Sequence, residues 1–281
     1  MVRPIRLEFP NALYHVMSRG NGGEDIFVED GDRQVFLDLL AELFTRHDVI
    51  CYAYCLMDNH YHLLVETPKA NLSQIMRRLN GRYTRFFNKT RRRMGHIFQG
   101  RYKAIIVQKD SYLLELSRYI ILNPVRAGMA DIPENYSWSS YCATIGQCAC
   151  PDWLAADNLL SSFGNQRKEA IRLYKGYVSQ GFDQPFSGKI SQQAYLGDKS
   201  FICEVQKHMS QKQNDSIHIT KRSKKSPKKP IGEIVSRAVD RKEAMNEIYK
   251  TGHYTMFEIA AYFNVHYSTV SRAIHSFCKM Q

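Results

Sequence analysis

Residues 57–66, MDNHYHLLVE, contain two histidines spaced so that they could act together. The run LLV favours a buried strand, in which alternate residues point to the same face. His60 and His62 would then project together, with Tyr61 on the other face. Two neutral imidazoles on one face can bind a divalent cation able to polarise a phosphodiester oxygen. The alternative is that both histidines belong to the surface or the core, because His-x-His alone is a weak signal.

Residues 111–128, SYLLELSRYIILNPVRAG, contain a candidate nucleophile. On a helix Tyr119 and Asn123 are four apart and share a face, so a hydroxyl that attacks a phosphate and an amide that completes a metal shell could meet. Tyr112 lies two turns before Tyr119 and could also face the histidines. Spacing favours Tyr119, because only Tyr119 has the Asn123 amide one turn further on. The alternative is that Tyr119 fills the core and Asn123 ends the helix before Pro124.

The charge of the chain points to a polyanionic partner. The 281 residues include 39 Lys and Arg against 27 Asp and Glu, a net charge of +12, which suits nucleic acid. Between Glu66 and Asp110 there is no acidic residue, and phosphate binding explains such a one-sign interval better than solubility does. The residues in it that we expect to contact DNA are Arg78, Arg82, Arg85, Lys89, Arg91, Arg92, Arg93, Arg101 and Lys103.

Other features of the composition set the cellular context. The seven cysteines are scattered and never form two CxxC pairs, so we expect reduced, mostly structural thiols. No apolar run approaches the ~20 residues needed to span a bilayer, and no leader precedes the first strand. These features predict a cytoplasmic protein.

Alternating strands and helices must position the candidate residues. Apolar patterns predict strands over 11–19, 50–57, 60–66 and 103–108. Between them, Asp30 or Asp32 can cap one helix, and residues 72–86 form a second helix with arginines on its outer side. Ser111 can cap a third helix that Pro124 ends. The order βαββαβ plus a C-terminal helix indicates an α+β fold, a ferredoxin-like antiparallel sheet with helices on one face.

The remaining chain divides by composition. We predict a first domain over 1–147, a helical connecting region over 148–215, a basic linker over 216–230 and a small all-α domain over 231–281. In the last domain, NVHYSTVSRAIH resembles the helix-turn-helix of the bacterial replication-initiator DNA-binding domain. A helical hairpin without a DNA role is the alternative. The resemblance would bring to the DNA groove His266, Tyr267, Ser268, Thr269 and Arg272.

The motifs of the first domain, taken together, resemble one family. The histidine pair, the acid-free basic interval and the run from Tyr119 through NPVRAG, followed by WSSY and PDWL, strongly resemble the single-tyrosine HUH transposases, in particular the REP-associated tyrosine transposases. The resemblance implies a catalytic domain for hairpin-bearing single-stranded DNA, with Mg²⁺ or Mn²⁺ held by His60, His62 and Asn123. Tyr119 would be the nucleophile and form a 5′-phosphotyrosine link that a DNA 3′-hydroxyl later reverses.

Three positions depart from the family pattern. Asp58 stands where the family often has proline, so its carboxylate could come near the metal. Tyr61 stands where the family usually has a bulky apolar residue. Asn123 replaces the glutamine of the insertion-sequence transposases, although asparagine fits the REP-associated branch.

The expected partners are single-stranded hairpin DNA and duplex DNA bound by the C-terminal domain, with the protein acting as a monomer or homodimer. A second reading is a domesticated regulator that keeps the fold and the helix-turn-helix but no longer cuts DNA. A third is an RNA-binding module, which would have the same electrostatics.

Overall fold

The computed structural model describes residues 7–182, 194–207, 230–236, 240–251, 254, 256–266, 269–270 and 272–274. The chain forms two compact units, Met1–Lys212 and Gln213–Gln281, hereafter the first and second units. In the described residues no helix is long and apolar enough to cross a membrane.

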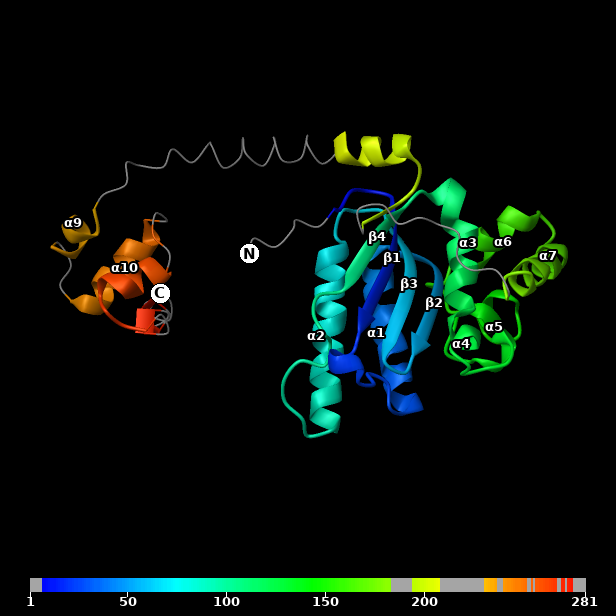
Figure 1. The fold of residues 1–281 in the computed structure, drawn as a ribbon, viewed down its shortest axis with the longest axis horizontal. Helices are drawn as coiled ribbons and strands as arrows, with labels where there is room; N and C mark the ends of the chain where they lie inside the picture. The colour runs from blue at the N-terminus through cyan, green and yellow to red at the C-terminus, as the bar shows by residue number, and fades with distance from the viewer. Residues whose placement is uncertain are drawn as a thin grey trace. The chain divides into compact units, whose positions relative to one another are not determined.

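The first unit is built on a five-stranded sheet of order β2-β3-β1-β4-β5 (Figure 1). Its strands are β1 (Ala12–Arg19), β2 (Ile50–Met57), β3 (His60–Thr67), β4 (Lys103–Val107) and β5 (Tyr195–Leu196). The first four strands pair antiparallel, and helices α1 and α2 occur where the βαββαβ order expects them. The predicted α+β class is confirmed.

The sheet is mixed, which corrects the prediction of an antiparallel sheet. The fifth strand pairs parallel with β4, and the backbone N–H of Ile106 and of Gln108 donate to the oxygens of Ala194 (2.8 Å) and Leu196 (2.8 Å). A strand of two residues is too short to show an alternating pattern, so the sequence contained no signal for it.

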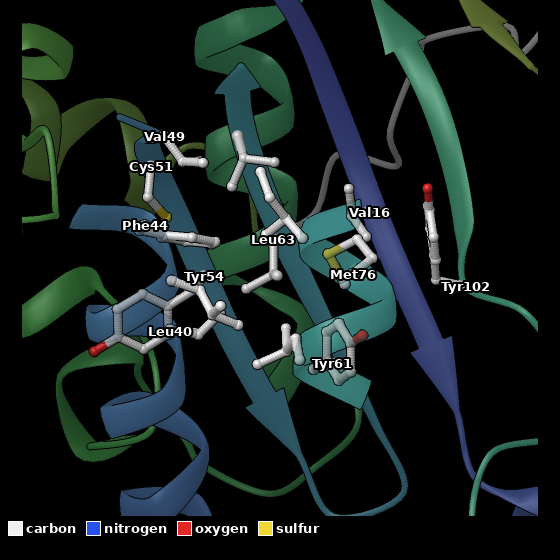
Figure 2. Close-up of a cluster of buried hydrophobic side chains, with 14 of the residues drawn as sticks. Val16, Leu40, Phe44, Val49, Cys51, Tyr54, Tyr61, Leu63, Met76 and Tyr102 are labelled. Atoms are coloured by element: carbon white, nitrogen blue, oxygen red, sulfur yellow. The ribbon is translucent and has the colours of Figure 1, made fainter. Parts of the chain in front are cut away.

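Helices α1 (Asp30–His47) and α2 (Leu72–Thr90) cover one face of the sheet. Figure 2 shows Val16, Tyr61 and Leu63 of the strands against Leu40 and Met76 of these helices. All five side chains are buried, and burying one such side chain contributes about 1.5–3 kcal/mol. This layer is the main core of the first unit.

Two details of these helices differ from expectation. Glu29, rather than Asp30 or Asp32, is the N-cap of α1, and Asp32 completes the capping box. An acidic residue in the first turn of a helix is common, so the sequence did not single out the cap itself. On α2 the last buried aromatic residue is Phe87, while Phe86 is only partly buried.

Helix α3 (Lys109–Ile121) and the segments after it cover the opposite face. It begins after Gln108, before the expected cap Ser111, and Pro124 is the second residue of the next helix. The short helices that follow are α4 (Asn123–Arg126), α5 (Tyr141–Thr144), α6 (Ala156–Leu160) and α7 (Arg167–Ser179). Turns of 3₁₀ helix span Asn21–Gly23, Pro133–Asn135 and Ser161–Phe163.

The outer edge of β2 is covered by later segments of the chain. The N–H of Leu56 donates to the oxygen of Trp138 (2.9 Å), and the N–H of Ala155 donates to the oxygen of Cys51 (2.8 Å). Bridges also join Cys55 to Ser139 and Cys51 to Leu154. The WSSY and PDWL segments therefore protect one edge of the sheet, and β5 protects the other.

The second unit contains α9 (Ile231–Val235), α10 (Arg241–Lys250) and α11 (Met256–Tyr262). Its small core includes Met245, Ile248, Ile259 and Val270, and the Asp240 carboxylate caps α10. The helix-turn-helix stays a prediction. Most of the predicted basic linker, residues 216–229, lies outside the described residues, as do Tyr267 and Ser268.

Candidate active site

Strand β3 presents His60 and His62 on the sheet face that α3 covers. Their ring centroids are 5.0 Å apart. His62 is buried, whereas His60 is half-buried. The sheet therefore places the two imidazoles side by side, as the alternation of a strand requires.

A third histidine, His15 on β1, completes the cluster. Its Nε2 lies 2.8 Å from Nδ1 of His62, and the two rings are stacked with centroids 5.1 Å apart. His15 is only 4 % exposed. Sequence reasoning did not include it; the available signal was a lone polar residue at an inward position of an otherwise apolar strand.

Helix α3 brings Tyr119 against these histidines. The Tyr119 ring centroid lies 6.2 Å from that of His15 and 6.1 Å from that of His62. Asn123 donates its Nδ2 hydrogen to the Tyr119 backbone oxygen (2.9 Å), so its Oδ1 keeps its capacity as an acceptor. The guanidinium of Arg126 lies 5.5 Å from the Tyr119 ring centroid. Tyr112 packs on the hydrophobic cluster of this face.

The turn before His60 is tied down on both sides. Arg33 of α1 forms an ion pair with Asp58, and the Asp58 backbone oxygen accepts the N–H of Ile26 (2.8 Å) and of Phe27 (2.9 Å). Asn59 Oδ1 lies 2.7 Å from His60 Nδ1. One Asp58 carboxylate oxygen is thus engaged by Arg33.

Burial keeps all three imidazoles neutral. It lowers the pKa of His15 to about 3. The pKa of His62 is well below its ordinary value through burial and then through His15 and His60. The pKa of His60 is lowered by burial and then by the Arg19 charge. Neutral imidazole is the form that binds a metal.

The histidine pair opens onto a cleft of about 820 Å³. Both His60 and His62 line it, together with three cationic residues, Arg19, Arg101 and Lys103. Arg101 and Lys103 belong to the predicted basic set, whereas Arg19 was missed because it lies outside the acid-free interval. The cleft therefore combines candidate metal ligands with positive charge.

The other predicted basic residues lie elsewhere. Helix α2 packs on the opposite face of the sheet, where Arg78, Arg85 and Lys89 are exposed. Arg82 of the same helix forms an ion pair with Glu42 (2.6 Å).

The loop after α2 contains the rest of the basic set. Arg91 donates two hydrogen bonds to buried Asp32 (2.9 and 2.6 Å), and Arg93 pairs with Glu24 (2.9 Å). Arg92 is exposed. Arg91 thus stabilises the start of α1, in addition to any role at a surface.

In the second unit, His266 and Arg272 are exposed and Thr269 is half-buried. Their contact with DNA stays a prediction.

The donor set fits a divalent cation, although in the described residues no group of three His, Cys, Asp or Glu side chains could hold one. An imidazole nitrogen binds a transition metal at about 2.1 Å, which places two ring centroids on one ion roughly 4.5–5 Å apart. The separation of His60 and His62, 5.0 Å, is of that size. The third donor would be the Asn123 amide oxygen, which hard cations accept.

Comparisons with known proteins agree with this geometry. Residues 8–123 match the family model described as Transposase IS200 like. A Haemophilus influenzae protein named as a REP-associated tyrosine transposase is 25% identical over 134 residues, 41% of this chain and 76% of the relative.

Two solved structures are similar at low sequence identity. A REP-associated tyrosine transposase bound to a REP hairpin has a TM-score of 0.45 and 14% identity, over 52% of this chain and 87% of that one. A transposase structure from Deinococcus radiodurans has a TM-score of 0.31 and 17% identity, over 42% and 95%. The family match itself comes from the sequence and spans His60, His62, Tyr119 and Asn123. Through residues 8–123, the chain belongs to the IS200-like transposase family.

Proposed function

We propose that the first unit, through a ferredoxin-like catalytic core, nicks single-stranded DNA at hairpin sequences and transfers the cut strand, with Tyr119 as the nucleophile. The observation that carries the proposal is the position of the Tyr119 ring, 6.1 Å from the ring of His62. A tyrosine beside a histidine pair, at a cationic cleft, combines a nucleophile with groups that hold a phosphodiester.

In the proposed reaction the Tyr119 oxygen attacks a backbone phosphorus and the bond from phosphorus to the 3′ oxygen breaks. The phenol loses its proton to water in the cleft, and the leaving oxygen becomes a 3′-hydroxyl. The 5′ end stays on the protein as a phosphotyrosine, and a later attack by a DNA 3′-hydroxyl restores Tyr119 and joins the strands. The phosphodiester bonds broken and formed balance over the cycle.

The residues around the cleft have distinct roles in this proposal. His60, His62 and the Asn123 amide oxygen would hold Mg²⁺ or Mn²⁺, which supplies charge stabilisation at the phosphate oxygens. Arg126 packs against the Tyr119 ring and maintains its orientation. Arg19, Arg101 and Lys103 contact phosphates of the strand in the cleft.

The choice of substrate follows from the relatives. One similar structure has a REP hairpin bound, and we extend that class of DNA to this chain. For the second unit we propose a helix-turn-helix that binds duplex DNA, with His266, Thr269 and Arg272 among its contacts.

A comparison of two tyrosine variants tests the proposal. We expect Tyr119→Phe to bind hairpin DNA as the wild type does but to form no covalent adduct, because it lacks only the attacking oxygen. The matched control is Tyr112→Phe on the same helix, which should still form the adduct. The measurement is a denaturing gel of the full chain incubated with labelled single-stranded hairpins and Mn²⁺. Adduct formation by Tyr119→Phe would contradict the assignment.

A further inference from the structure

The hydrogen bonds of Asn59 determine which of its side-chain atoms faces His60. Its Nδ2 lies 3.2 Å from the backbone oxygen of Gly23, which can only accept. Nδ2 must therefore be the donor there, so the atom 2.7 Å from His60 Nδ1 is the amide oxygen. The amide orientation, which electron density often leaves ambiguous, is assigned here by its partners.

This orientation fixes the tautomer of His60. An amide oxygen cannot donate, so His60 Nδ1 must carry the hydrogen. In a neutral imidazole the other nitrogen then has the free lone pair. His60 therefore presents Nε2 as the atom available to a ligand in the cleft.

His15 occupies the corresponding position for His62. Its Nε2 lies 2.8 Å from His62 Nδ1, which leaves Nε2 as the second ring nitrogen of His62. That Nε2 has a lone pair only if Nδ1 carries the hydrogen and donates it to His15. His15 is buried on β1, so its ring is fixed by the sheet.

We propose that Asn59 and His15 are positioning residues, which hold His60 and His62 as Nδ1–H tautomers so that both Nε2 lone pairs serve one divalent cation. This inference rests on the metal site of the proposed function. Partners that orient metal-bound histidines in this way typically change metal affinity about 10–100-fold when they are removed.

The loop that holds Asn59 is closely fitted. The N–H of Gly20 donates to the Asn59 backbone oxygen (2.8 Å). A Cβ at Gly20 would lie 1.9 Å from the backbone oxygen of Glu24, so any larger residue would displace this loop. Asn59 is therefore held by the backbone of residues 20–23 as well as by His60.

The first test reads the tautomers without metal or DNA. Long-range ¹H–¹⁵N correlation spectra of the full-length, metal-free protein should show His60 and His62 as Nδ1–H tautomers. An Nε2–H tautomer at either residue in the wild type would overturn the proposal.

The second test is a Mn²⁺ titration by calorimetry, again without DNA. We expect Asn59→Leu and His15→Phe to weaken Mn²⁺ binding about 10–100-fold. Asn59→Asp and His15→Gln keep an acceptor oxygen and should recover most of that loss. A matched control is Tyr52→Phe, which removes a buried hydroxyl that bonds Glu66 on the same sheet face (2.8 Å) and should leave Mn²⁺ affinity unchanged.

Thermal unfolding of each variant separates misfolding from positioning, since a purely structural loss would not be rescued by an acceptor. Unchanged affinity in folded Asn59→Leu would overturn the role of Asn59. These readouts are independent of the Tyr119 adduct assay. Wild-type tautomers as expected, with no adduct on any hairpin, would count against the proposed function while supporting the positioning role.

Discussion

At the scale of single residues, the ion pair of Arg33 and Asp58 holds the turn that precedes His60. Arg33 is nearly buried, with 9% of its side chain exposed, whereas Asp58 is 49% exposed. The other carboxylate near Arg33 belongs to exposed Asp30, at 3.6 Å. The two partners therefore differ in what their loss leaves behind.

We predict that Asp58→Asn destabilises the protein by about 1–3 kcal/mol, because a buried guanidinium loses its main charged partner. Arg33→Met should cost less, since it leaves only a carboxylate that water can reach. Urea unfolding of both variants and of the double variant measures this. In the double variant no buried charge remains, so it should be no less stable than Asp58→Asn. A larger cost for Arg33→Met would contradict the argument.

Sequence spacing was sufficient for the residues that lie close together along the chain. His60 and His62 share a strand, and Tyr119 and Asn123 share a helical turn, so local periodicity predicts that each pair shares a face. His15 and Arg19 reach the cleft only through the register of β1 against β3. A single sequence does not determine which strands pair, so these two residues could not be assigned.

At the scale of elements, Asp198 joins β4 to the helical residues 199–207. Its carboxylate accepts the N–H of Phe201 (2.8 Å) and the hydroxyl of Ser200 (2.6 Å), and it exchanges hydrogen bonds with the Gln108 side chain. These bonds, in the order Phe201, Ser200 and Gln108, lower the pKa of Asp198 to about 2.

A lowered carboxyl pKa means that the ionised form favours the folded state. This stabilisation should be fully present above about pH 4 and should be lost as the pH falls toward 2. We therefore predict that Asp198→Asn lowers the thermal unfolding midpoint near neutral pH, and that the difference from the wild type shrinks between pH 5 and pH 2.5. Differential scanning fluorimetry over that range measures it. A difference that does not change with pH would argue against the role of the charge.

Helix α2 and the cleft lie on opposite faces of the sheet, so their positive charges should affect different steps. We predict that Ala at Arg78, Arg82 and Arg85 together flattens log K against log salt by about 0.7 per lost single-strand contact. The rate of adduct formation at saturating DNA should not change. By contrast, Arg101→Ala should slow adduct formation, because Arg101 lines the cleft. An unchanged salt slope would mean that α2 does not contact DNA.

The elements were predictable where their hydrophobic pattern was long. The strand over 50–57 has the bounds that its pattern predicted, and α2 buries the expected apolar face up to Tyr83. Tertiary contacts decided the rest. β5 exists because β4 offers it an edge, and the arginines of α2 face away from the site because the opposite side of that helix is apolar.

At the scale of the whole molecule, the candidate catalytic residues all lie in the first unit. We predict that deletion of residues 213–281 leaves cutting of short single-stranded hairpins intact and reduces affinity for duplex DNA. Adduct gels and duplex titrations on the truncated protein measure the two effects. A folded truncated protein that cannot cut would place part of the active site in the second unit.

The pairing of β5 with β4 also matters during synthesis. Paired residues are 89 positions apart, Ile106 with Tyr195 and Val107 with Leu196. At a translation rate of about 5–20 residues per second, roughly 4–18 s pass between the emergence of the two strands from the ribosome. For that time the outer edge of β4 is open to any neighbouring chain. Strand exchange between nascent copies on one messenger RNA is thus a hazard of synthesis, and the finished protein closes it with two residues.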